Sequence, residues 1–326
     1  MPRIGPVKYG ELIGRFGSPA AAIEFLNPPE SHVDLVKREM DAAERLNIIY
    51  IPDDSNDYPQ NLRAVKNHPP VISVRGNIKT LQKHAVAIVG TRHATGAGLK
   101  FTAELAHAFA EHDTAVVSGM AMGTDTAAHT GALAAGRDAA TIAVLAGGAD
   151  VIWPPENEKL YYQIIERGCA VSAMPVGQSP DASLFIQRNR WIAGCAEKLI
   201  LGEADEKSGS VATARFMVEM ERPVYAIPSH PSDPRSRGPN RLIQSGSARL
   251  CTGADDFFAN GKKIERTDNR AQSPDNDLID KLGNIPIAES VLAELVKKDV
   301  GEIKRRLVML ELSGVVKKQD GGYVKR

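Results

Sequence analysis

The spacing of apolar residues divides the chain into segments of different character. In residues 1–66, apolar positions recur at helical intervals, as in ELIGRFGSPAAAIEFL, and Gly and Pro residues interrupt them. We therefore expect a small N-terminal helical module over residues 1–66.

The central segment, residues 67–262, contains short apolar runs rich in Val, Ile and Ala. They are AVAIVG (85–90), TAVVSG (114–119), TIAVLAGG (141–148), CAVSAMP (169–175), KLILGEA (198–204) and RPVYAIPS (222–229). Helical stretches such as GLKFTAELAHAFAEH and GSVATARFMVEME lie between several of them. Buried strands alternating with helices are typical of a mostly parallel sheet covered on both faces. This pattern predicts an α/β fold, an extended Rossmann-like domain whose ligand edge lies at the carboxyl ends of the strands.

The C-terminal segment has a third pattern. Residues 263–284 are polar and aperiodic, which is typical of a linker. Residues 285–326 contain two amphipathic helices, IAESVLAELVK and VGEIKRRLVMLELSGVVKK, and then a hairpin signal around Asp320-Gly321-Gly322. Helices followed by a β-hairpin predict a small winged-helix domain.

The overall composition gives no sign of a nucleic-acid partner, because 40 basic and 40 acidic side chains cancel in 326 residues. A positive potential that attracts nucleic acid must therefore arise from local clustering of basic residues. Residues 186–250 hold 10 basic groups, of which 8 are Arg, against 7 acidic ones. The three cysteines lie far apart without a CxxC pair, which argues against a zinc site or disulfides. The sequence has no apolar run long enough to cross a bilayer and no signal peptide. We therefore expect a cytoplasmic protein that is not associated with a membrane and that holds no metal ion or cofactor.

Two loops that follow predicted strands have the composition of phosphate-binding turns. In the first, Gly90 lets a phosphate approach the backbone, and Thr91 and Arg92 offer a hydroxyl and a guanidinium fork. A tight turn with a surface Arg is the alternative interpretation. In the second, Gly119 and Gly123 precede a helix for which Thr124 or Asp125 is the expected N-cap. His129 on that helix has no nucleophile nearby, so we expect it to be structural.

Two further clusters carry similar chemistry. Arg188, Asn189 and Arg190 suit phosphates or base edges, whereas the adjacent Trp191 is expected in the core. Ser208, Gly209 and Ser210 form the turn before a helix and offer hydroxyls and amides. No GxxxxGK[ST] motif occurs, so a P-loop ATPase is not expected. Four such loops at one sheet edge suit a run of phosphates better than one nucleotide.

A succession of motifs then resembles a known family. AIVGTRHATGAGL, VVSGMAMGTDTAAHTGAL, TIAVLAGGADVIWPPENEKL, RNRWIAGCAEKLILGEA, KSGSVATARF and SDPRSRGPNRLIQSGS, in this order, are similar to the DNA-processing protein A (DprA, or Smf) family over about residues 50–258. The resemblance implies a non-catalytic, dimeric protein that binds and protects single-stranded DNA. It also implies that the protein loads the recombinase RecA during natural transformation.

The resemblance also implies roles for individual positions. The family's phosphate motif falls on residues 90–92, and its Arg-Asn-Arg segment falls on residues 188–190. A basic residue near the Pro-Pro-Glu-Asn loop, which helps hold DNA in relatives, corresponds to Lys159. Met122 replaces a residue that is usually basic, so we expect the affinity for DNA to be reduced at this loop.

Three other classes of protein compete with this interpretation. A phosphoribohydrolase of the lysine-decarboxylase-like group needs the Glu of PGGxGTxxE, but Ala128 stands three positions after Asp125 here. A dinucleotide-dependent oxidoreductase needs GxGxxG after its first strand, which GTRHATGAG does not supply. A transcription factor would read duplex DNA with the C-terminal helix, but residues 286–326 carry a net charge of only +3, from 9 basic and 6 acidic groups. Release of adenine from AMP would favour the first of these classes.

Overall fold

The computed structural model describes residues 4–258, 276–279, 281–282, 286–312, 315–319 and 321–325. The chain divides into two compact units, Met1–Phe258 and Ala259–Arg326. The polar segment 263–284, which we expect to be a linker, lies outside the described residues except for 276–279 and 281–282.

The first unit is built on one nine-stranded sheet. Its strands are β1 (Ile48–Pro52), β2 (Val71–Gly76), β3 (Ala85–Val89), β4 (Ala115–Ser118), β5 (Thr141–Leu145), β6 (Cys169–Ser172), β7 (Lys198–Leu201), β8 (Val224–Ala226) and β9 (Arg249–Leu250). Their order in the sheet is β1-β2-β6-β5-β4-β3-β7-β8-β9. The pairs from β6 to β9 are parallel, whereas β2 runs antiparallel to both β1 and β6. The mostly parallel, Rossmann-like sheet that the apolar runs predict is thus confirmed.

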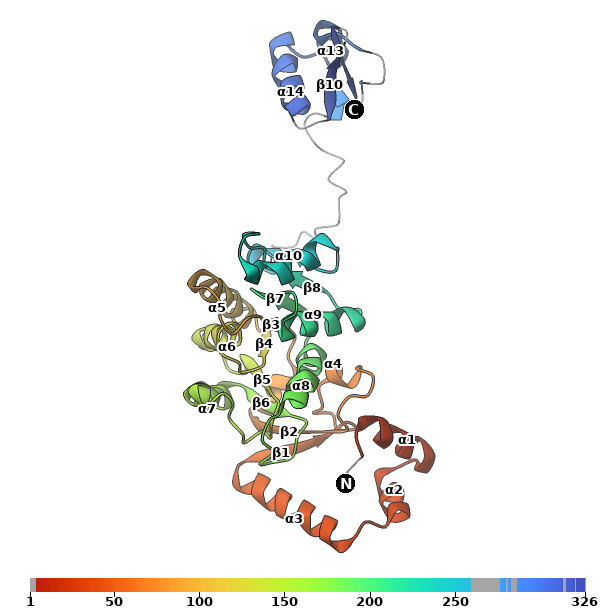
Figure 1. Cartoon of the computed structure of the whole chain (residues 1–326), viewed down its shortest axis with the longest axis vertical. Helices are drawn as coiled ribbons and strands as arrows, with labels where there is room; N and C mark the ends of the chain where they lie inside the picture. The colour runs from red at the N-terminus through yellow and green to blue at the C-terminus, as the bar shows by residue number, and fades with distance from the viewer. Residues whose placement is uncertain are drawn as a thin grey trace. The chain divides into compact units, whose positions relative to one another are not determined.

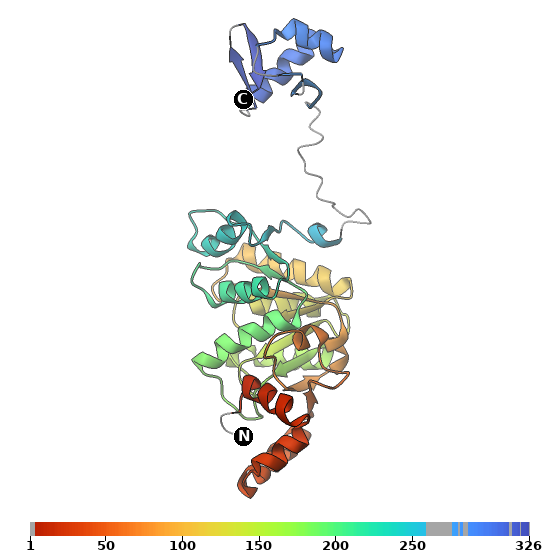
Figure 2. The same cartoon turned by 90° about the vertical axis from the view of Figure 1, so that its right-hand side faces the viewer.

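Helices cover both faces of this sheet (Figures 1 and 2). One face carries α5 (Gly96–Glu111), α6 (Thr124–Ala134) and α7 (Glu158–Arg167), and the other carries α4 (Gln60–Arg63), α8 (Ala182–Cys195) and α9 (Gly209–Glu219). Because apolar side chains on both faces of β3, β4 and β5 are covered, every residue of these strands is buried. Such doubly buried strands have continuous apolar sequences, which is why they were predictable.

The strand order changes direction beside β3. The chain adds β4, β5 and β6 on one side of β3 and returns to add β7, β8 and β9 on the other. The loops that leave β3 and β7 therefore diverge, and in open α/β sheets a crevice forms at such a switch point, outside the carboxyl ends of the strands. The topology alone places a ligand site between these two loops.

The N-terminal segment extends the sheet as well as forming helices. The helices α1 (Pro6–Phe16), α2 (Pro19–Leu26) and α3 (Glu30–Arg45) are followed by β1, which pairs with β2 from Ile48↔Arg75 to Pro52↔Val71. Residues 1–66 are therefore not wholly helical, because β1 belongs to the central sheet and precedes the expected boundary at residue 66.

Short elements complete the first unit. They are the 3-10 turns η1 (Ile78–Gln82), η2 (Pro155–Asn157) and η3 (Pro234–Ser236), and the helices α10 (Arg237–Gln244) and α11 (Asp255–Phe258). The α11 aromatic rings pack on α5, since the Phe257 and Phe258 ring centroids lie 5.0 Å and 4.9 Å from that of Phe109. This contact fixes the end of the unit.

The second unit contains α12 (Asn276–Ile279), α13 (Glu289–Val296), α14 (Val300–Leu312) and the antiparallel strands β10 (Val316–Gln319) and β11 (Gly322–Lys325). Its own core includes Leu292, Ile303, Leu307 and Tyr323. Ile287 also pairs with Tyr323 through two backbone hydrogen bonds, of 2.9 Å and 3.1 Å. The two helices and the hairpin lie where the sequence predicts them, and a winged-helix assignment remains a prediction.

The separation of the units leads to a test by truncation. A chain ending at Phe258 is expected to melt cooperatively, because it retains the sheet and the Phe257–Phe258 contacts. A chain ending at Asp256 loses four ring contacts, those of Phe257 with Phe109 and Tyr225 and those of Phe258 with Phe109 and His112. At about 1 kcal/mol for each contact, its Tm should be roughly 8–16 °C lower. Calorimetry of the two truncated proteins measures the difference, and equal melting temperatures would show that α11 does not anchor this end.

Candidate nucleic-acid interface

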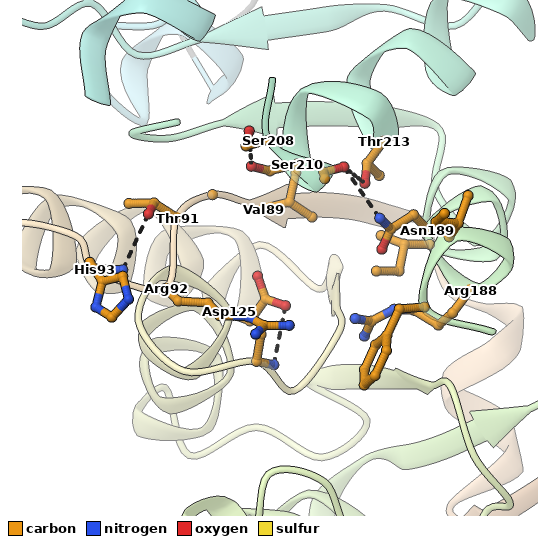
Figure 3. A pocket seen from close by; sticks show the side chains of 16 residues that line it. Val89, Thr91, Arg92, His93, Asp125, Arg188, Asn189, Ser208, Ser210 and Thr213 are labelled. Carbon is orange, nitrogen blue, oxygen red and sulfur yellow. Dashed lines mark hydrogen bonds between the residues drawn. The ribbon is translucent and has the colours of Figure 1, made fainter. Parts of the chain in front are cut away.

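A pocket of about 380 Å³ opens at the strand switch point. It is lined by Val89, Gly90, Thr91, Arg92, His93, Ala121, Asp125, Phe185, Ile186, Arg188, Asn189, Ile192, Ser208, Gly209, Ser210 and Thr213. These residues come from the end of β3 and the loop after it, from the loop after β4 and the first turn of α6, from α8, and from α9 and the residue before it. Three of the four segments selected from the sequence therefore meet around one cavity, and one of them, residues 188–190, lies within α8 rather than in a loop (Figure 3).

The loop after β3 is held rigidly by its backbone, which leaves its side chains free to face the pocket. The Thr91 amide donates to Glu203 O at 2.6 Å, and Thr91 O accepts from both the amide and the hydroxyl of Thr124. The Thr91 amide is thus not available to a ligand, and the Thr91 hydroxyl accepts from the His93 amide at 3.2 Å. Thr91 and the exposed Arg92 both line the pocket. Figure 3 shows Arg92 entering the cavity opposite Arg188.

The start of α9 supplies donors on another wall. Ser208 is the N-cap, and its Oγ accepts from the Val211 amide at 3.3 Å and lies 3.0 Å from Ser210 Oγ. The first-turn amides of a helix have no partner within the helix, and its dipole favours an anion there. Since Ser208, Gly209 and Ser210 line the pocket, this end of α9 is suited to a phosphate group.

Arg188 forms the buried wall of the pocket. Only 6% of it is exposed, and its Nη1 donates to Gly119 O and to Val144 O, the latter at 3.1 Å. Burial lowers the pKa of Arg188, while the nearby Asp125 carboxylate opposes this shift. A buried cation at the wall of a cavity attracts an anion strongly, because little water screens its charge.

Asp125 occupies the anion site expected in the loop after β4. Its Oδ2 accepts from the amides of Gly119 at 3.1 Å and Ala121 at 3.3 Å. Burial raises the pKa of Asp125, and the charge of Arg188 and these amides oppose that shift. A carboxylate of the chain itself, rather than a ligand, therefore uses these donors.

The same loop corrects the expected helix cap. The helix α6 begins at Thr124 with Gly123 as N-cap and no side-chain cap, so the assignment of Thr124 or Asp125 as N-cap was wrong. Gly123 has φ of 78°, and a Cβ there would lie 2.5 Å from the carbonyl oxygens of Thr91 and Arg92. Gly119, Gly123 and Thr124 do not line the pocket, but they position the residues that do.

Two other predicted residues lie away from the cavity. Arg190 donates through Nη2 to Lys66 O at 3.1 Å, and Lys159 is exposed on α7. Asn189, by contrast, lines the pocket and donates to Gly209 O at 3.3 Å, which ties α8 to α9.

Several residues that line the pocket were not among the predicted site residues. On α8, Phe185 lies one turn before Arg188, and Ile186 lies one turn before Asn189 and Arg190. The Arg188 guanidinium carbon is 5.7 Å from the Phe185 ring centroid. Their proximity to the Arg-Asn-Arg segment at helical spacing was a usable signal. His93, Asp125 and Thr213 likewise follow or lie close to the selected loops in sequence.

His129 is buried behind the site and does not line the pocket. Its Nδ1 lies 2.7 Å from Thr141 Oγ1, and that hydroxyl donates to Val116 O at 2.6 Å. Because the single hydroxyl proton is used there, Nδ1 must carry the proton it donates to Thr141. Burial, with a contribution from Arg188, lowers the pKa of His129 to about 3, so the ring is neutral at pH 7.

Comparison with known proteins identifies the family. The pattern of the DNA recombination-mediator protein A family matches residues 48–262, which is most of the first unit. The chain belongs to this family. The matched region begins at β1, in agreement with the extent of the sheet.

Relatives of the family agree in sequence and in fold. Protein Smf of Escherichia coli is 32% identical over 289 residues, covering 84% of this chain and 76% of that protein. The X-ray structure of DprA from Streptococcus pneumoniae is 31% identical, with a TM-score of 0.66 over 79% of this chain and 91% of that one. A DprA structure from Helicobacter pylori, described as giving insight into a single-stranded DNA binding mode, is 28% identical, with a TM-score of 0.60 over 65% of this chain and 94% of that one.

None of the described helices combines the length and the apolar character that crossing a bilayer requires. The described residues also contain no group of three or more His, Cys, Asp or Glu side chains placed to hold a metal ion.

The state of His129 leads to a prediction about acid stability. A histidine whose pKa in the folded state lies below its unfolded value of about 6.5 takes up a proton only when the protein unfolds. Below pH 6.5 this proton uptake favours the unfolded state, so the free energy of unfolding falls with pH. From pH 7 to pH 5, protonation of His129 in the unfolded state lowers the free energy of unfolding by about 2 kcal/mol. Urea titrations at both pH values should show a loss in the unsubstituted protein about 2 kcal/mol larger than in His129→Gln.

Other titrating groups contribute equally to both proteins, so the difference between them isolates His129. Equal pH dependence in the two proteins would contradict a neutral, buried ring. An overall loss of stability in His129→Gln, by contrast, does not affect the comparison.

Proposed function

We propose that this chain binds single-stranded DNA and holds a backbone phosphate in the pocket at the strand switch point. The observation that carries the proposal is the convergence of Arg92, Arg188 and the α9 N-terminus on one cavity. Guanidinium groups and helix amides are the donors that bind phosphate most strongly in proteins. Membership of the recombination-mediator family and the similarity to the Helicobacter pylori protein support the same ligand.

The apolar part of the lining favours a single strand over a duplex. Phe185 lies beside Arg188, and Ile186, which also lines the pocket, is largely exposed. In a duplex the base faces are stacked on one another, whereas in a single strand they are free to pack on apolar side chains next to a bound phosphate. Phosphate donors and apolar groups in one pocket thus match the two chemical parts of an unpaired nucleotide.

Five finer assignments form part of the proposal. The chain acts in the cytoplasm as a homodimer, transfers its DNA to the recombinase RecA in recombination or natural transformation, and catalyses no reaction itself. The C-terminal unit is a winged helix that assists these contacts. The description of the family as recombination mediators supports this role.

The direct test is an anisotropy titration with single-stranded and double-stranded oligonucleotides of the same sequence. Single strands should bind more tightly, with an affinity that falls steeply as salt rises, because each neutralised phosphate releases counterions. Equal affinity for both forms at moderate salt would contradict the proposal.

Arg92 gives the sharpest prediction for the site. Loss of a charge-assisted contact of about 1.5–3 kcal/mol should make Arg92→Ala bind single strands roughly 10- to 100-fold more weakly. The salt dependence should also become shallower by about one counterion. Arg92→Lys should recover only part of the affinity, because an ammonium group keeps the charge but not the fork.

Arg137→Ala is the matched control. Arg137 is an exposed arginine of the same unit, but it lies in the turn that precedes the amino end of β5, away from the pocket. The affinity of Arg137→Ala for single strands should be within about two-fold of that of the unsubstituted protein if the position of the arginine, rather than the total charge, determines binding. Unchanged affinity in a folded Arg92→Ala protein would place the phosphate site elsewhere.

A further inference from the structure

Trp153 is an exposed aromatic residue at the same sheet edge as the pocket. Half of it is exposed (50%), in the loop that follows β5, whereas the other tryptophan of the chain, Trp191, is 5% exposed and lies in the core. Tryptophan buries more apolar surface than other residues when it is covered. An uncovered ring at a ligand edge is therefore an unusual feature that the phosphate pocket does not explain.

The loop that carries Trp153 is held in place rather than loose. Tyr161 Oη donates to Ala149 O at 2.5 Å, and the Val151 amide donates to Gly148 O at 2.9 Å. Asn157 is buried, and its Nδ2 donates to Met120 O at 2.7 Å. These bonds fix both ends of the loop, so that the ring is presented without the entropy cost of ordering a mobile segment.

The Asn157 bond also joins this loop to the pocket. It reaches the loop after β4, in which Ala121 lines the pocket and the next residue, Met122, is 42% exposed. Because β3, β4 and β5 are neighbours, the pocket, Met122 and Trp153 follow one another along the carboxyl edge of the sheet. Neighbouring strands are about 4.8 Å apart, so the ends of the three strands from which these loops leave span about 10 Å.

We propose that Trp153, together with Met122, forms a stacking platform for the bases of a DNA strand whose phosphate occupies the pocket. A stacked strand has one phosphate per about 3.4 Å, so about 10 Å corresponds to about three nucleotides. Every base has an apolar face that stacks on an aromatic ring, so the platform binds without sequence preference. Met122, which stands where a basic residue was expected, adds a polarisable apolar contact to bases in place of a charge.

This inference rests on the proposed function, and its test separates the two. Trp153→Ala is titrated by anisotropy with an oligothymidylate and with an abasic oligonucleotide of equal length and charge. Affinity for the oligothymidylate should fall about ten-fold, whereas affinity for the abasic strand should change by less than about two-fold. The salt dependence should stay as it is, because no phosphate contact is removed.

Two further variants control for aromatic character and for exposure. Trp153→Phe keeps a ring and should retain most of the affinity for oligothymidylate. Tyr162→Ala removes an aromatic residue of α7 that is equally exposed, at 49%, and should have no effect. Trp191→Phe leaves Trp153 as the sole tryptophan, whose fluorescence oligothymidylate should quench and the abasic strand should not.

The outcomes are distinguishable. Unchanged binding of oligothymidylate by Trp153→Ala, or equal loss for both strands, overturns the platform while leaving the phosphate pocket intact. Failure of the unsubstituted protein to bind either strand overturns the proposed function and the platform together.

Discussion

The buried guanidinium of Arg188 connects the parts of the site. It links α8 to the ends of β4 and β5 through the carbonyls of Gly119 and Val144, and it lies close to the Asp125 carboxylate. A Cβ on Gly119 would lie 2.0 Å from Arg188 Nη1, so a side chain at this position would displace the guanidinium from its partners. Because a buried charge without such partners would cost several kcal/mol, these neighbours are as necessary as the arginine itself.

This arrangement explains why a chain of zero net charge has a local site for anions. Asp125 accepts hydrogen bonds from two amides of the loop after β4, which fix its carboxylate in the wall of the pocket. There it partly compensates the positive charge of Arg188. The exposed Arg92 and the free end of α9 are not compensated in this way. The positive potential is therefore concentrated in the pocket, where an elongated anion enters from solvent.

The sequence was sufficient to predict the central strands of the sheet but not the strands near its two ends. The buried strands were predictable because their apolar runs are continuous, whereas β1 and β2 are partly exposed and β9 has only two residues. These three strands depend on pairing with partners that are distant in the sequence, which local patterns do not encode.

Within the site, the sequence indicated the right segments but not the direction of each side chain. Arg188, Asn189 and Arg190 are consecutive, yet each helical residue is rotated by about 100° from the one before it. Arg188 is therefore buried, Asn189 contacts α9, and Arg190 contacts Lys66 O. The role of Asp125 could not be predicted either, since it depends on where two backbone amides point.

The late position of β7 in the chain has a consequence for synthesis on the ribosome. Until β7 emerges, β3 has a partner on one side only, β4, and its fully buried sequence AVAIV has an open backbone edge. Unpaired apolar edges are the surfaces on which nascent chains aggregate or recruit chaperones. The wall of the pocket formed by α9 also comes after β7, so a growing chain completes its central strand and its ligand site at nearly the same moment.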